Sequence, residues 1–158
     1  MKRGSILFLR AVLVLIGVGA LALLLWEPQT EGRNAHATTF ETYFKDPFLA
    51  YIYLASVALF VALYQAFKVL GYVGESRMLS PAGVKGLRTI KHCALTIIGF
   101  AAGAELIIIL SRNDDPQGGF FIGVLIAFGA TVVATAMSVL ERTLQNAVDI
   151  KSEHDLTV

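Results

Sequence analysis

Glu105 is the residue whose chemistry most needs an explanation, because it is the only acid inside any of the long apolar runs of this sequence. A carboxyl group at such a position can bind a proton or a cation, and ionisable residues inside membrane helices commonly mark functional sites. It can also be a structural group held by a hydrogen bond, and Tyr51 and Tyr53 of the preceding run are expected at a similar depth. We expect Glu105 to face the other helices and to bond to one of these tyrosines, while the proton- or cation-site interpretation stays open.

A second group of residues combines opposite charges at the edge of two runs. Three bases precede the run 93–110, and acids follow the run 120–140; they are Lys85, Arg88 and Lys91, and Glu141, Asp149 and Glu153. A short turn between these runs puts Glu141 near the level of Arg88, so we expect the acids and bases to neutralise each other. The alternative is a docking surface for a cytosolic partner, because exposed ion pairs are weak and leave a surface available.

Catalytic and metal-binding patterns are missing from the sequence. His36, His92, His154 and Cys93 are scattered, and adjacent helical residues such as His92 and Cys93 point about 100° apart, which is unsuitable for joint ligation. Neither a glycine-rich phosphate loop nor a nucleophile elbow occurs. We therefore expect no enzymatic activity, no metal and no cofactor. The basic cluster is short and lies beside an apolar run, so direct binding of nucleic acid is not expected either.

The elements that position these residues are four apolar runs. The chain has 158 residues, of which 56% are hydrophobic and 16% charged, with a mean hydropathy of +0.67. The runs cover residues 6–26, 47–73, 93–110 and 120–140, and each approaches or exceeds the about 17–25 residues that cross a bilayer as a helix. The sequence predicts an all-α integral membrane protein in the lipid bilayer, a single transmembrane domain that forms a four-helix bundle with antiparallel neighbours.

The distribution of Lys and Arg predicts the orientation. Eight lie beside one set of helix ends and three beside the other; the eight are Lys2, Arg3, Arg77, Lys85, Arg88, Lys91, Arg142 and Lys151, and the three are Arg33, Lys45 and Arg112. We expect the protein in the cytoplasmic membrane of the cell. By the positive-inside rule, both of its termini are expected on the cytoplasmic side. Arg10 and Lys68 lie near the same helix ends, where they can reach the headgroups or pair with Glu141.

Local signals predict the helix boundaries. Asp46-Pro47 and Ser80-Pro81 each place a capping residue before a proline at the first helical position. The helical pattern continues past Leu140, so we expect the third and fourth helices to extend into the cytosol, with residues 141–158 as a helical extension and tail. Thr38 and Glu41 form a capping-box pattern, which predicts a short interfacial helix between the first two runs.

Small residues at helical spacing predict where the helices pack. Gly99 and Gly103 form a GxxxG pattern, and further small residues recur on the second and fourth runs, including Ala62, Ala66, Gly123, Ala130 and Ala134. We expect these contacts to lie within one chain, although the pattern leaves a homo-oligomer open.

The first run follows a basic start and precedes an Ala35-His36-Ala37 motif, but it is too long and too distant from that motif for a typical signal peptide, so we expect it to be retained.

Three segments carry a family resemblance: KDPFLAYIYLASVALFVALYQAFKVL, SPAGVKGLRTIKHCALTIIGF and, most specifically, the ending VLERTLQNAVDIKSEHDLTV. They resemble the bacterial membrane family of domain of unknown function 2975, over essentially the whole chain. The resemblance implies four transmembrane helices with cytoplasmic termini and no known activity. It also favours a regulatory partner, since members resemble companions of small helix-turn-helix regulators. His154 departs from the asparagine that is common in that ending.

Two classes of function therefore remain. The first is a binding, regulatory or accessory membrane protein that engages a cytosolic regulator or another membrane protein through Lys85, Arg88, Lys91, Glu141 and Asp149. The second is a small transporter or ion-conducting subunit that uses Glu105. A water-accessible cavity at Glu105 would favour the second class, whereas a carboxyl group sealed by packing and tyrosine contacts would favour the first.

Overall fold

The computed structural model describes residues 3–30, 36, 38–45, 47–110 and 116–157. These residues form α1 (Arg3–Thr30), α2 (Thr39–Phe44), α3 (Pro47–Gly74), α4 (Pro81–Leu110) and α5 (Pro116–Leu156). Helices α1, α3, α4 and α5 are each long and apolar enough to cross a membrane. Each of the four apolar runs lies within one of these helices, so the predicted all-α membrane fold is confirmed.

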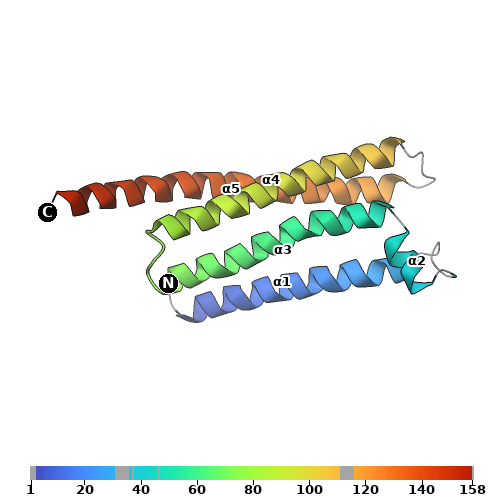
Figure 1. Cartoon of the computed structure of the whole chain (residues 1–158), viewed down its shortest axis with the longest axis horizontal. Helices are drawn as coiled ribbons and strands as arrows, with labels where there is room; N and C mark the ends of the chain where they lie inside the picture. The colour runs from blue at the N-terminus through green and yellow to red at the C-terminus, as the bar shows by residue number, and fades with distance from the viewer. Residues whose placement is uncertain (1–2, 31–35, 37, 46, 111–115, 158) are drawn as a thin grey trace.

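Figure 1 shows α1, α3 and α4 side by side, with α5 crossing α4, and the contacts between the long helices make this arrangement an open row. The extensive contacts follow the order of the chain, from α1 to α3, from α3 to α4 and from α4 to α5, and the last pair is the most extensive. Neighbouring helices are antiparallel, so the beginning of α1 and the end of α5 lie at the same end of the bundle. The short α2 lies at the opposite end of the bundle. The helices expose large apolar side chains such as Leu15, Leu54 and Phe128, which is expected of a surface that faces lipid.

The best-buried apolar cluster joins α3 to α4. Val69, Leu87 and Ile90 are buried there, and Ala62, Ala66, Met78, Met137 and Leu144 pack around them. A Cβ atom at position 86 would lie only 2.6 Å from Cγ2 of Val69, so Gly86 permits this close approach. Small residues therefore set the distance between helices, as is common in membranes.

Some of the small residues make the helix contacts that the sequence predicts, and others do not. Ala130 and Ala134 of α5 are buried, and Gly103 lies against the Tyr51 hydroxyl, as the packing interpretation predicts. Gly99 has no other group within 4 Å of where its Cβ would be, so the predicted packing contact at this glycine is wrong. Only one half of the GxxxG pattern is used within the chain, since the other half faces outward from the row.

The turn from α3 to α4 shows why α4 begins at Pro81. The Ser80 hydroxyl accepts a hydrogen bond from the Gly83 N–H at 3.3 Å, which caps the helix as predicted. Ser76 in this turn has a φ of 55°, and a Cβ at position 83 would overlap the Met78 carbonyl oxygen. The corresponding prediction for Asp46, and those for the turn at residues 111–115, lie outside the described residues.

Candidate functional site

Glu141 of α5 is held by two bases of α4. Arg88 Nε donates to one carboxyl oxygen at 2.6 Å, and Lys91 Nζ donates to the other at 2.5 Å. Arg88 and Lys91 are three residues apart and therefore share one face of α4. Glu141 itself is only 8% exposed. The predicted proximity of Glu141 to Arg88 is confirmed.

Charge-assisted hydrogen bonds stabilise the ionised form of this carboxyl group. The hydrogen bond from Lys91, and after it the one from Arg88, lowers the pKa of Glu141 below its usual value, although burial acts in the opposite direction. Glu141 directly follows the run 120–140 that the sequence predicts to span the membrane. The three residues thus form an ion pair network next to the predicted span.

The other predicted charge pairs do not form. Asp149 accepts a hydrogen bond from the Gln145 amide at 2.8 Å, and among the described residues neither Asp149 nor Glu153 makes an ion pair with Lys85. Their predicted mutual neutralisation is wrong, because Asp149 and Glu153 lie further along α5, toward its free end. Lys85 therefore has no acidic partner among the residues that the structure describes.

Arg10 and Lys68 are not partners of Glu141, so that suggestion is wrong. The Arg10 guanidinium lies 4.7 Å from the centre of the Phe67 ring, and Lys68 Nζ lies 5.6 Å from the centre of the Tyr64 ring. The open row explains the difference, because α4 separates α5 from the helices that carry Arg10 and Lys68. Both cations instead lie over aromatic faces, which attract positive charge.

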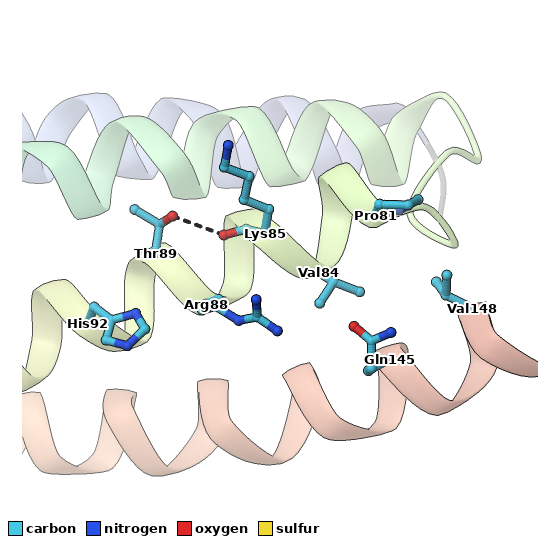
Figure 2. A pocket seen from close by; sticks show the side chains of 8 residues that line it. All are labelled: Pro81, Val84, Lys85, Arg88, Thr89, His92, Gln145 and Val148. Atoms are coloured by element: carbon cyan, nitrogen blue, oxygen red, sulfur yellow. Dashed lines mark hydrogen bonds between the residues drawn. The ribbon is translucent and has the colours of Figure 1, made fainter.

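A pocket of about 440 Å³ lies between the first three turns of α4 and the facing part of α5. Its lining includes three residues of basic type, Lys85, Arg88 and His92, and two residues of α5, Gln145 and Val148. Figure 2 shows Arg88 and His92 between the two helices with Gln145 and Val148 opposite, while Lys85 extends to the side away from α5. Lys85 and Arg88 were predicted as part of a site from the sequence, whereas His92 and Gln145 were not, although the spacing of 85, 88 and 92 puts the three basic-type residues on one helical stripe.

Glu105 faces α5 and not the tyrosines of α3. Both of its carboxyl oxygens are buried, and neither has a hydrogen-bond partner among the described residues. The carboxyl group lies against Gly123, where a Cβ atom would overlap it. The expectation that Glu105 faces a neighbouring helix is confirmed.

The predicted hydrogen bond between Glu105 and a tyrosine is wrong. Tyr51 donates to the Phe100 carbonyl at 2.8 Å, and Tyr53 donates to the Leu24 carbonyl of α1 at 3.0 Å. Tyr51 lies against Gly103. Glu105 is two residues further along α4, so its side chain points about 200° around the helix from that contact. Equal depth in the membrane therefore did not imply contact.

A comparison of substitutions at Glu105 tests this geometry. A buried polar group without a partner costs about 1–3 kcal/mol, so Glu105→Leu should raise the free energy of unfolding, by about 1 kcal/mol. Glu105→Gln keeps an unpartnered polar group and should change stability less. Unfolding in mixed detergent micelles, followed by circular dichroism, measures both. A greater loss of stability for leucine than for glutamine would instead indicate a hydrogen bond to Glu105.

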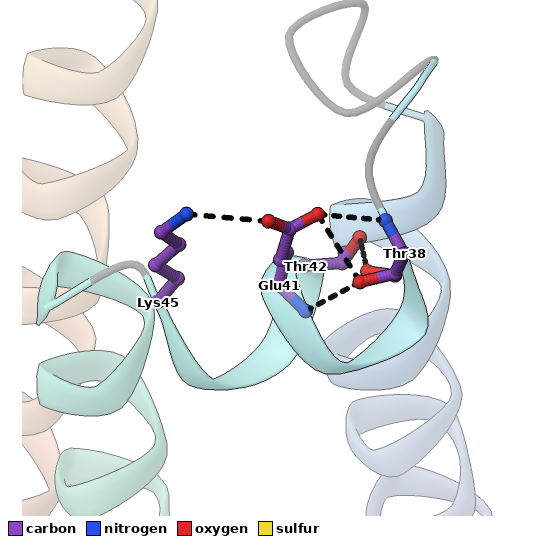
Figure 3. A network of polar contacts seen from close by, with 4 residues as sticks. All are labelled: Thr38, Glu41, Thr42 and Lys45. Carbon is purple, nitrogen blue, oxygen red and sulfur yellow. Dashed lines mark hydrogen bonds and ion pairs between the residues drawn. The ribbon is translucent and has the colours of Figure 1, made fainter.

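The end of the bundle that carries α2 has a network of hydrogen bonds that orders this short helix. Thr38 accepts a hydrogen bond from the Glu41 N–H at 3.3 Å, and the Thr38 N–H donates to the Glu41 carboxyl at 3.2 Å (Figure 3). The predicted capping box and short helix are confirmed. The Thr38 N–H, followed by Lys45, lowers the pKa of Glu41. Tyr43 attaches α2 to α1 by donating to the Leu25 carbonyl at 2.8 Å, a contact that the sequence analysis missed.

The described residues hold no group of three His, Cys, Asp or Glu side chains that could bind a metal ion.

Comparisons with known proteins agree with the membrane character of the helices. The model of a family described as "Protein of unknown function (DUF2975)" matches residues 32–158. The chain belongs to the DUF2975 family. This DUF2975 chain is 39% identical over 160 residues to "Uncharacterized membrane protein YoaS" of Bacillus subtilis (strain 168), and the match covers 100% of both chains. No solved structure matches significantly. The DUF2975 chain is thus a membrane protein, and its function has to be argued from its own residues.

Proposed function

We propose that this protein is a binding or regulatory membrane protein, or an accessory subunit, whose cytoplasmic face engages another protein. That face comprises Lys85, Arg88, Lys91, Glu141 and Asp149. The observation that carries the proposal is the length of α5, which continues past the beginning of α4 (Figure 1). Residues 149–157 are all exposed, including Ile150 at 68%. A free helical end with exposed apolar and charged side chains is suited to docking a partner.

The excess of Lys and Arg supports a cytoplasmic location for this end of the row. The described cations Arg3, Arg77, Lys85, Arg88, Arg142 and Lys151 lie on segments that share it, while Lys45 lies at the end that carries α2. By the positive-inside rule we place both termini in the cytoplasm and the protein in a bacterial cytoplasmic membrane. Helix α5 and the start of α4 then extend into the cytosol.

The proposal includes no enzymatic activity and no direct binding of nucleic acid. Glu141 is committed to Arg88 and Lys91, and Glu105 lies on a different part of α4, so the described acids and bases do not converge on a reacting group. The partners proposed are the lipid bilayer and a cytosolic regulator or another membrane protein. A second copy of the chain is the alternative partner.

Site-specific photo-crosslinking tests the docking face. A photoreactive amino acid at Ile150 of the full-length protein should form one discrete adduct with another protein in cells. The yield of this adduct should fall when Lys85→Glu reverses an unpaired charge of the face. The control position is Phe40 on α2, which is equally exposed at the opposite end of the row. Adducts of the same size and yield at both positions, or no adduct at Ile150, would contradict the proposal.

A second candidate function is a small transporter or ion-conducting subunit that uses Glu105. The observation in its favour is the absence of a hydrogen-bond partner for either carboxyl oxygen among the described residues. A group without a structural partner that lies inside a membrane helix is a candidate proton or cation site. Proton or cation flux into proteoliposomes that disappears in Glu105→Gln would favour this function, and absence of flux in the wild type would exclude it.

A further inference from the structure

We propose that the pocket between α4 and α5 binds the phosphate of an anionic glycerophospholipid. This inference does not depend on the docking of a protein partner. It also does not depend on the orientation of the chain, because headgroups line both sides of a bilayer. It follows from the position of the pocket, from its charge and from the surface that continues above it.

The pocket lies at the depth of the lipid headgroups. His92 directly precedes the apolar run that begins at Cys93, and Arg88 lies four residues, or about 6 Å, further from that run. The headgroup layer on each side of a bilayer is of a similar thickness. Arg88 and His92 therefore meet phosphate groups when the apolar run occupies the hydrocarbon core. The volume of about 440 Å³ is also sufficient for a phosphate with its glycerol.

The charges of the pocket favour an anion. Among the described residues that line it none is acidic. Glu141 is not among the lining residues, and Arg88 Nε and Lys91 occupy its two oxygens, while Asp149 is hydrogen-bonded to Gln145. The two terminal amino groups of Arg88 make no hydrogen bond to any described residue, so they remain available as a planar donor pair. A guanidinium group binds phosphate through such a pair.

His92 adds a further donor to the same pocket, and Lys85 adds a positive charge at its edge, with its ammonium group directed away from α5. Both line it, and the described residues provide neither of them with an ion pair or a side-chain hydrogen bond. Basic pockets between transmembrane helices at the membrane boundary are a recognised form of headgroup site. Glu141 thus contributes by fixing Arg88 in place, because the hydrogen bond to Nε orients the guanidinium group.

The surface above the pocket suits an acyl chain. Gly99 lies seven residues after His92 and therefore on the same stripe of α4, about 10 Å deeper in the apolar run. It is exposed, and no other group lies within 4 Å of where its Cβ would be. A lipid whose phosphate occupies the pocket can lay its chain over this glycine. This apolar continuation favours a lipid over a soluble phosphate compound.

Lipid retention by the purified full-length protein tests the proposal. Native mass spectrometry from mixed micelles should show one retained phosphatidylglycerol and much less phosphatidylcholine. The Lys85→Gln/His92→Gln variant should retain the anionic lipid about fivefold more weakly, the effect expected for one basic residue at a membrane surface. The matched control is Lys151→Gln/His154→Gln, which removes the same residue types from the exposed end of α5 and should retain the lipid like the wild type.

A third variant tests the acyl path without changing any charge. Gly99→Leu fills the open surface above the pocket, and it should lower phosphatidylglycerol retention while the protein stays folded. Equal retention of phosphatidylglycerol and phosphatidylcholine, or equal loss in the pocket and control variants, would overturn the proposal. Displacement of the lipid by an equal concentration of glycerol 3-phosphate would show that the pocket selects a soluble phosphate, and this would overturn the assignment to a lipid.

Discussion

Replacing Gly86 with alanine is expected to lower the free energy of unfolding by about 2 kcal/mol, within the range typical of overpacking a well-packed site. The added Cβ would lie 2.6 Å from Cγ2 of Val69, and Val69 is β-branched and buried in the cluster that joins α3 to α4. A stiff side chain in a full cluster cannot turn away, so the two helices must separate. Reversible unfolding in mixed detergent micelles, followed by circular dichroism, measures the change.

Two further variants separate the contact from a general effect of removing glycine. Gly99→Ala on the same helix has open space around it and should leave stability unchanged or raise it slightly, because alanine favours helix. Combining Gly86→Ala with Val69→Ala should cost less than the sum of the two single changes, since the overlapping group is gone. Strict additivity of the two changes would refute the packing explanation.

Replacing Glu141 with leucine is expected to cost about 2 kcal/mol. Loss of the shared acceptor leaves two cations unpaired, and breaking a fully buried pair costs about 3–5 kcal/mol. The smaller value applies because the Arg88 side chain is 52% exposed and that of Lys91 is 23% exposed, so water stabilises part of the freed charge. Asp149→Asn is the control, and it should change stability by less than about 0.5 kcal/mol because Asp149 is exposed.

The same network predicts a dependence on pH. The pKa of Glu141 is lowered in the folded protein relative to its ordinary value of 4.5, so the ionised carboxylate stabilises the fold at neutral pH. This contribution is complete above pH 4.5 and is lost as the pH falls through the lower, folded-state pKa. Wild-type unfolding should therefore show a loss of stability on acidification that is smaller in Glu141→Gln. An identical acid dependence of the two proteins would contradict the assignment.

The helices and their ends were predictable because each is determined by short stretches of sequence. An apolar run of membrane-spanning length specifies a helix, and Ser80-Pro81 and the Thr38–Glu41 pair specify where helices begin. The pairing of Glu141 with Arg88 was predictable for a related reason. A short turn between two helices fixes their relative depth, so residues at equal distances from the turn meet.

Contacts that depend on the direction around a helix could not be predicted in the same way. Tyr51 and Glu105 lie at similar depths, but the tyrosine meets the Gly103 side of α4 while the carboxyl group meets α5. The open row was equally hidden, because helices that are apolar on all sides do not indicate which side meets a neighbour. The pocket lining at His92 and Gln145 required knowledge of which faces of α4 and α5 meet.

The helices contact one another in the same order in which the ribosome synthesises them. Helix α3 meets α1 already in place, α4 then meets α3, and α5 meets α4, so no segment has to wait for a distant part of the chain. Such sequential neighbours favour fast assembly, because little loop entropy is lost before each contact forms. The chain can therefore fold helix by helix during insertion, and the large α4–α5 interface, which closes last, completes the molecule.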